Sequence, residues 1–268
     1  MRNRRVNAGV PACVGLWLLW LAALAAAQTN PQPGALEPSF AGSASCRQCH
    51  EAFYQLWVPT HHGLAMQPYT PEFAQENLTA QDAPVKIGKF EYHACVGREE
   101  GWVVERGLDG EKRHPIAHVM GGKNVYYFLT PMERGRLQTL PLAYDVRTRE
   151  WFDTAGSGVR HFPGAGADAP VHWTDPMFTF NTSCHGCHVS QLSTNYDGKT
   201  DTYRTTWAEP GINCESCHGP AQEHVRVCQA AARSVPVRAS QETPHGVTTN
   251  PQDLKIISTR SFTPEQTN

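Results

Sequence analysis

The chain has 268 residues, with 23 Lys and Arg against 25 Asp and Glu, and a formal net charge of −2. This balance argues against a basic nucleic-acid surface, so we expect no nucleic-acid partner. The length suits one domain or two small ones. Because 22 residues are Gly and 20 are Pro, the polypeptide would struggle to build a conventional apolar core unaided.

The N-terminus has the pattern of an export signal. Arg2, Arg4 and Arg5 precede an apolar run over 10–27 that ends in three alanines. This pattern predicts a signal peptide at 1–27, cleaved before Gln28, and a periplasmic or otherwise exported protein. The alternative is that the segment is retained and associates the protein with a membrane. Cleavage removes three arginines and moves the formal charge to about −5.

Residues 28–44 form a Pro-rich stretch that we interpret as a linker. A Cys-x-x-Cys-His motif follows, and after it the sequence predicts a short helix. Phe53, Leu56 and Trp57 stand at i, i+3 and i+4, and Pro59 ends the pattern. His61 and His62 come directly after this helix.

The middle of the chain changes to strand-forming sequence. The segments "KFEYHACVGREEGWVVERG", "NVYYFLT" and "RLQTLPLAYDVRTREWFDT" are β-branched and aromatic, with turns between them. They predict a small β-rich insertion at about 85–153. We interpret "SGVRHFPGAGADAPVHW" as a loop, "VRVCQAAARSVPVR" as one helix ending before Pro236, and 231–268 as a polar tail.

One motif occurs three times. Cys-x-x-Cys is followed at once by His in "CRQCH", "CHGCH" and "CESCH", which supply Cys46, Cys49 and His50, then Cys184, Cys187 and His188, then Cys214, Cys217 and His218. This is the signature of c-type haem attachment: two thiols bind the vinyl groups and the His gives the iron its proximal nitrogen. Zinc sites or redox dithiols are the alternative. We predict three covalently bound haem c groups in a multihaem domain at 45–230, with an α+β fold of helices and loops wrapped around the haems.

The second axial ligand of each haem separates an electron carrier from an enzyme with an open iron. Ten histidines remain after the three proximal ones. The best candidates lie next to haem motifs or glycine turns, and they are His61 or His62, His118 and His224. His172 and His185 are weaker candidates. If Met66 or Met120 were an axial ligand, it would raise the reduction potential of its haem, but each is better interpreted as a core residue.

Two cysteines lie outside the motifs and the signal segment. Cys95 and Cys228 are either two free thiols or a disulfide of an oxidising compartment.

The stretches "SCRQCHEAFYQLWVPTHHGLAM", "NTSCHGCH" and "GINCESCHGPAQEHVRV" resemble the multihaem c-type cytochrome family. That family is typified by the tetrahaem cytochrome that accepts electrons from hydroxylamine oxidoreductase, and it has exported members joined to tetratricopeptide repeats. The resemblance implies distal ligands at His61 or His62, at His224 and at His118. The chain has three attachment motifs where the family often has four or more.

The sequence therefore favours an exported multihaem cytochrome that relays single electrons to and from redox partner proteins, with no catalytic residue. Two other classes stay open: an oxidoreductase with one open-site haem acting on a small nitrogen or sulfur species, and a haem-bearing docking module of a larger redox complex. The oligomeric state and the partner's identity do not follow from the sequence.

Overall fold

The fold comes from a computed structural model, which describes residues 39–97, 100–156, 171–234, 254–258 and 263. The expected signal peptide, most of the linker and the loop at 157–170 lie outside the described residues, as do His161 and His245. None of the helices in the described part of the chain combines the length and the apolar character needed to span a bilayer.

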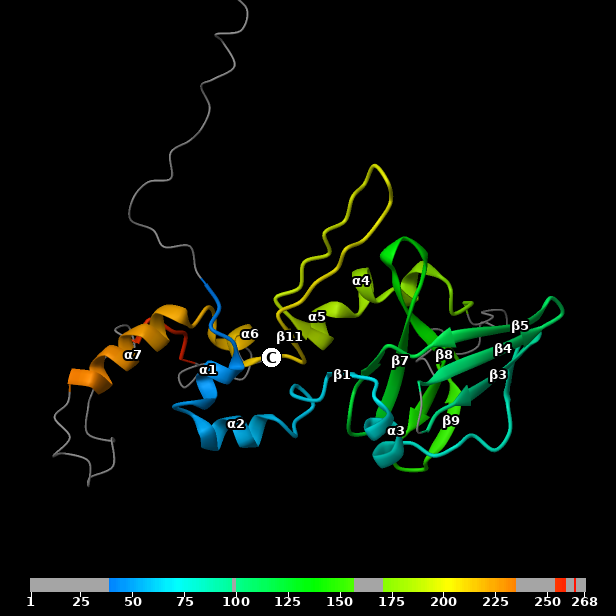
Figure 1. Ribbon diagram of the computed structural model, residues 1–268, viewed down its shortest axis with the longest axis horizontal. Helices are drawn as coiled ribbons and strands as arrows, with labels where there is room; N and C mark the ends of the chain where they lie inside the picture. The colour runs from blue at the N-terminus through cyan, green and yellow to red at the C-terminus, as the bar shows by residue number, and fades with distance from the viewer. Residues whose placement is uncertain (1–38, 98–99, 157–170, 235–253, 259–262, 264–268) are drawn as a thin grey trace, which may run out of the picture. The chain divides into compact units, whose positions relative to one another are not determined.

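The fold combines helices with antiparallel sheets, as the α+β expectation requires (Figure 1). A five-stranded sheet has the order β1-β6-β7-β8-β9, and a four-stranded sheet has the order β2-β3-β4-β5. The bounds of the first are β1 (Met66–Pro68), β6 (His118–Met120), β7 (Val125–Pro131), β8 (Leu137–Asp145) and β9 (Glu150–Asp153). Those of the second are β2 (Val85–Ile87), β3 (Phe90–Cys95), β4 (Trp102–Gly107) and β5 (Gly110–Pro115).

Helices occupy the rest of the chain, with one short strand pair between them. The pair joins β10 (Val189–Ser190) to β11 (Glu209–Pro210). The helices are α1 (Ser43–Arg47), α2 (Glu51–Trp57), α3 (Pro71–Asn77), α4 (Phe180–Ser183), α5 (His185–His188), α6 (Cys214–His218) and α7 (Gln222–Ser234), with short 3-10 turns η1 (Glu133–Gly135) and η2 (Pro176–Phe178). Strands β2 to β9 all lie within 85–153. The polar tail was expected to begin at residue 231, but α7 continues through residues 231–234.

The main core lies in the β-rich part, where side chains of both large sheets pack with α3. Thr70 caps this helix through its hydroxyl, which accepts from the Phe73 amide at 3.1 Å, and Pro71 begins the first turn. Strand β8 pairs with β7 and β9, and it is buried along nearly its whole length because β3 and α4 also pack against it. Pro141 interrupts its register with β7, as expected for a residue that has no amide hydrogen to donate. The core cluster includes Phe73, Tyr92, Val103, Val119, Tyr126, Phe128, Leu140, Leu142, Tyr144 and Trp173.

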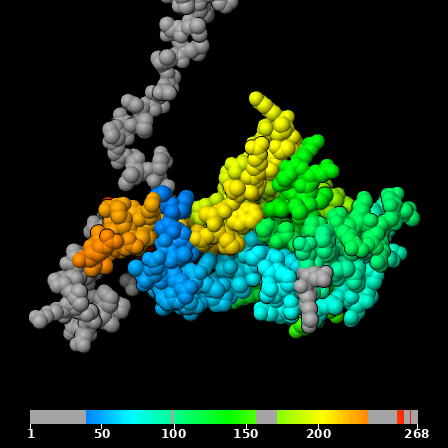
Figure 2. Space-filling model, viewed as in Figure 1, coloured from blue at the N-terminus to red at the C-terminus, as the bar shows by residue number. Residues whose placement is uncertain are grey.

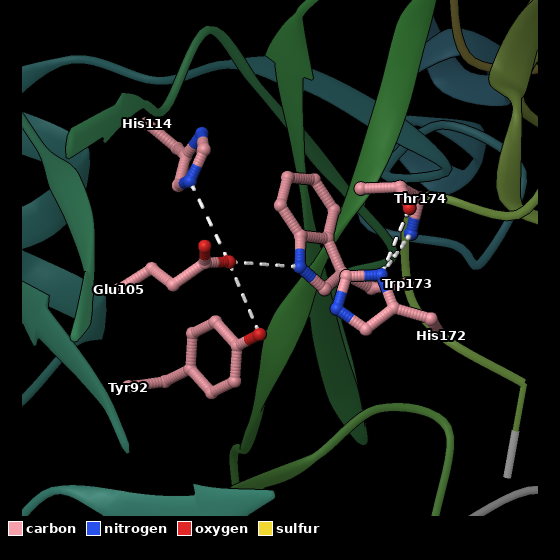
Figure 3. A network of polar contacts seen from close by, with 6 residues as sticks. All are labelled: Tyr92, Glu105, His114, His172, Trp173 and Thr174. Carbon is pink, nitrogen blue, oxygen red and sulfur yellow. Dashed lines mark hydrogen bonds and ion pairs between the residues drawn. The ribbon is translucent and has the colours of Figure 1, made fainter. Parts of the chain in front are cut away.

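A buried carboxylate lies at the edge of this core (Figure 3). The Oε2 atom of Glu105 on β4 accepts from the Tyr92 hydroxyl at 3.1 Å and from Trp173 Nε1 at 3.2 Å. The Nε2 atom of His114 lies 3.8 Å from the same oxygen and has no hydrogen-bond partner. Burial lowers the pKa of His114 below its usual 6.5, although Glu105 acts in the opposite direction. The neutral imidazole is therefore the form that the fold favours.

This network predicts a pH dependence of stability. Because the folded pKa of His114 is lowered, the unfolded chain takes up a proton there first as the pH falls below about 6.5, and the fold loses stability. Replacing His114 with Gln should flatten the dependence of the thermal midpoint on pH below that value, with His172→Gln as the control. An unchanged slope in His114→Gln would contradict the assignment.

Candidate haem-attachment sites

Each of the three Cys-x-x-Cys-His motifs forms about one helical turn. They lie in α1 and the residues after it, in α5, and in α6. In every motif the first cysteine is half-buried and the second is exposed. Residues at i and i+3 of a helical turn lie on the same side, so this spacing suits attachment of both thiols to one porphyrin edge.

In two of the motifs a backbone carbonyl orients the ring of the histidine. The Nδ1 atom of His188 donates to the Ala65 carbonyl at 2.6 Å, and Nδ1 of His218 donates to the Ile257 carbonyl at 2.8 Å. A carbonyl can only accept, so the proton is on Nδ1 and the lone pair is on Nε2. Metal-ligating histidines in proteins are held in this way.

His50 of the first motif faces His224 of α7. Their ring centroids are 6.3 Å apart and their planes differ by 14°. A metal–imidazole bond is about 2 Å long, and the centroid lies about 1 Å behind the bonded nitrogen, so two imidazoles on opposite sides of one metal have centroids about 6 Å apart. His224 also donates from Nδ1 to the Leu254 carbonyl at 2.8 Å. This arrangement suits a haem iron with a histidine on each side, and Figure 2 shows the first motif (blue) beside α7 (orange).

The surroundings of His50 are apolar and open. The Phe53 ring lies 6.5 Å from the His50 ring, edge to face, and 73% of Phe53 is exposed. Leu56, one turn further along α2, is 70% exposed. A porphyrin attached at the first motif is a large apolar plate of the kind that such side chains pack against, so these residues fit the cofactor.

The first and third motifs meet at their leading cysteines. The pKa of Cys46 is raised to about 12 by burial, by the nearby Cys214 and by a hydrogen bond between the two side chains, with smaller effects from Glu215 and Glu209. Helices α1 and α6 are in contact. Two groups attached at these motifs are therefore neighbours, although the motifs are far apart in the sequence.

The second and third motifs are joined by a compact polar network. The His188 carbonyl accepts from the Gly211 amide at 2.9 Å, just beyond the β10–β11 pair. The buried hydroxyl of Ser190 donates to the Gly211 carbonyl at 2.8 Å and accepts from the Asn213 amide at 2.8 Å. Between the two motifs, residues 191–207 form a two-legged loop, yellow in Figures 1 and 2, closed by two isolated bridges.

His118 lies beside the second motif. It begins β6, and because residues two apart on a strand share a face, it points to the same side as Met120. Met120 is 3% exposed and belongs to an apolar cluster that reaches Cys184 and Trp207. The His118 ring packs edge to face on Trp207 at 5.4 Å, and burial lowers its pKa. The neutral imidazole that results is the form that binds metals.

His61 and His62 lie in a turn against the segment that leads to the third motif. The His62 carbonyl accepts from the Ile212 amide at 3.0 Å, and Trp57 Nε1 donates to the Ile212 carbonyl at 2.9 Å. Gly211 has φ +79°, and a Cβ there would meet the His62 carbonyl oxygen at 2.8 Å, so this close approach requires glycine. The turn therefore packs against Gly211 and Ile212, which come just before Cys214 in the sequence.

The weaker candidates take other positions. Met66 and Met120 are partners across the β1–β6 pair and lie in the apolar cluster. His172 is exposed, and its Nδ1 is 2.8 Å from the Thr174 hydroxyl. Cys95 and Cys228 are both free thiols. Cys228 lies 3.7 Å from His224 Nδ1, and its pKa is raised by burial and by nearby Cys49.

Sequence reasoning missed several residues of these sites. The carbonyls of Ala65, Leu254 and Ile257 orient three histidines, and two of these carbonyls come from the segment 231–268, which the sequence indicated only as a polar tail. A peptide carbonyl has no signal in the sequence. Glu215 was also missed, because it stands at a variable position of its motif. Among the described residues, no three His, Cys, Asp or Glu side chains converge as they would around a single bound ion.

Comparison with known proteins gives one family. The family of cytochrome c554 and c-prime matches residues 45–112 and 168–219, and these two segments contain all three motifs. No curated protein matches significantly. A solved structure, that of the outer cell wall cytochrome OcwA, is 20% identical, with a TM-score of 0.44 over 71% of this chain. The aligned part covers 34% of that protein, so the chain spans about a third of its length. The family match supports a c-type cytochrome, a protein that carries covalently bound haem and transfers electrons, as the class of this chain.

Proposed function

We propose that the protein is an exported multihaem cytochrome that relays single electrons through three haem c groups. The observation that carries this proposal is the facing pair His50 and His224, whose spacing suits one six-coordinate iron. An iron held by histidine on both sides has no free position for a substrate, so this haem would exchange electrons and not perform chemistry on a small molecule.

The positions of the other histidines suggest how the three haems are ligated. His224 serves the first haem opposite His50. His118 serves the second haem, because it shares a face with the cluster around Cys184. His61 or His62 serves the third haem, because their turn packs on the residues before Cys214. In this assignment a histidine fills the second axial position of each of the three irons. Because no methionine is a ligand, the reduction potentials of the haems would be low.

The haem groups supply the one-electron chemistry, and the residues of the chain hold them in reach of each other. The contact between α1 and α6 joins the first site to the third. The network around Ser190 and Asn213 joins the third to the second. We therefore propose that electrons pass from the second haem to the third and then to the first, or in the reverse direction. This order differs from the order of the motifs in the sequence. Redox partner proteins would dock at the ends of this series, outside the cytoplasm.

Replacing His224 with Ala tests the proposal. The protein, produced with cytochrome maturation machinery, should have an intact mass of the polypeptide plus three haems in both wild type and variant. In His224→Ala one haem should become high-spin in electronic and magnetic resonance spectra, and carbon monoxide should then shift the Soret band of that one haem in the reduced protein. The reduced wild type should barely respond to carbon monoxide.

The matched control is His172→Ala, which removes an exposed histidine bonded to Thr174 and should change no haem. A bare polypeptide mass would refute haem attachment. A wild type that binds one carbon monoxide per protein would favour the oxidoreductase alternative, and hydroxylamine and nitrite would be the first substrates to test.

A further inference from the structure

Glu215 is a buried carboxylate in a place where its motif does not require one. It stands directly after Cys214 in "CESCH" and is 3% exposed. A buried carboxylate is costly unless every oxygen is hydrogen-bonded. The partners of Glu215 therefore indicate why the fold tolerates it.

All three donors to this carboxylate are backbone amides. Oε1 accepts from Ala41 at 2.8 Å and from Ala221 at 2.7 Å, and Oε2 accepts from Gly42 at 2.8 Å. Ala41 and Gly42 precede α1, which contains Cys46, and Ala221 precedes α7, which contains His224. One side chain of the third motif thus holds both segments that supply ligands to the first haem.

A second carboxylate supports the same junction. Glu209 on β11 accepts from the Ser43 amide at 2.7 Å. Gly42 has φ +78°, and a Cβ there would come within 2.9 Å of Glu209 Oε1. Both the positive φ and the close approach require glycine at this position. Glu209 makes one bond to this segment where Glu215 makes two.

We propose that Glu215 is a positioning residue that holds the first haem motif against the third and thereby sets the coupling between the two haems attached there. This inference rests on the proposed function, since it needs both haems in place. A local role, the capping of the turn from α6 to α7, would involve the Ala221 amide alone. The two bonds to Ala41 and Gly42 have no such local purpose, because those residues are 174 and 173 positions away.

Replacing Glu215 with Gln tests the inference, because the amide keeps the shape but turns one acceptor into a donor that faces backbone N–H groups. Neighbouring haems give a bisignate Soret circular dichroism signal whose amplitude depends on their separation and relative orientation. Glu215→Gln should lose most of that amplitude while its intact mass still shows three haems. Glu209→Gln should lose less, and the exposed Glu133→Gln should keep the wild-type signal.

An unchanged Soret signal in a three-haem Glu215→Gln protein would overturn the inference. If that variant does not assemble, hydrogen exchange on the wild-type holoprotein decides. The amides of Ala41 and Gly42 should exchange at least about tenfold more slowly than those of exposed loops, because bonds to a charged acceptor are strong. Exchange as fast as in exposed loops would overturn it. Either failure would leave the haem count and the His224 result intact, so it is distinguishable from failure of the proposed function.

Discussion

Replacing Leu142 with Ala should destabilise the protein by about 2–5 kcal/mol. Leu142 is fully buried in β8, between the strands on either side, and it packs in the main core cluster. The substitution removes three carbon atoms and leaves a cavity that a central strand cannot collapse to fill. For a protein of this size, each kcal/mol corresponds to about 2–4 °C in the thermal midpoint. Far-ultraviolet circular dichroism during heating would measure the loss.

The chain offers a matched control for this substitution. Leu108 lies in the turn between β4 and β5 and is 94% exposed. Leu108→Ala should therefore change the stability by no more than about 0.5 kcal/mol. Equal effects at the two leucines would show that β8 is not the centre of the core.

Replacing Glu105 with Ala should cost about 2–5 kcal/mol, because it leaves two buried donors without an acceptor. The Tyr92 hydroxyl and Trp173 Nε1 both donate to Oε2 of this carboxylate (Figure 3). The pKa of Tyr92 is raised by burial and by the adjacent Glu105, so the hydroxyl remains a donor at ordinary pH. Denaturant titration followed by far-ultraviolet circular dichroism would measure the change in stability.

Two further variants separate the buried acceptor from the charge. Glu105→Gln keeps an acceptor oxygen, so it should lose less stability than Glu105→Ala. Glu111 on β5 forms exposed ion pairs with Arg106 and Arg113, and Glu111→Ala should change little, since solvent screens such pairs. A Glu105→Ala protein as stable as Glu111→Ala would contradict the buried network.

Local patterns in the sequence predicted much of the fold. Phe53, Leu56 and Trp57 indicated α2, and the β-branched segments indicated strands where β3, β4, β7, β8 and β9 form. These predictions succeeded because helix and strand periodicity is a property of neighbouring residues. The helix expected before Pro236 also forms, although it begins at Gln222.

The tertiary relations could not be predicted in the same way. The sequence singled out His224 as a ligand candidate, but its position opposite His50 depends on α7 folding back to the first motif. The polar tail gave no sign of its contribution to the sites, because that contribution is made by the backbone carbonyls of Leu254 and Ile257. Glu215 looked like a variable residue because two of its three donors are amides that lie 174 and 173 positions away in the sequence.

The junction at Glu215 closes a very long loop of polypeptide. The entropy of bringing two chain positions together depends only on the logarithm of the number of residues between them, so doubling such a loop costs about 0.6 kcal/mol. Two of the three hydrogen bonds to this carboxylate, from Ala41 and Gly42, span separations of 174 and 173 residues, and lengthening the intervening chain adds little to the entropic cost of closing it. The β-rich segment lies inside this loop. Its length could change by insertion or deletion with little entropic penalty to the meeting of the first and third motifs, which leaves that segment free to diverge while the spacing of the redox groups is preserved.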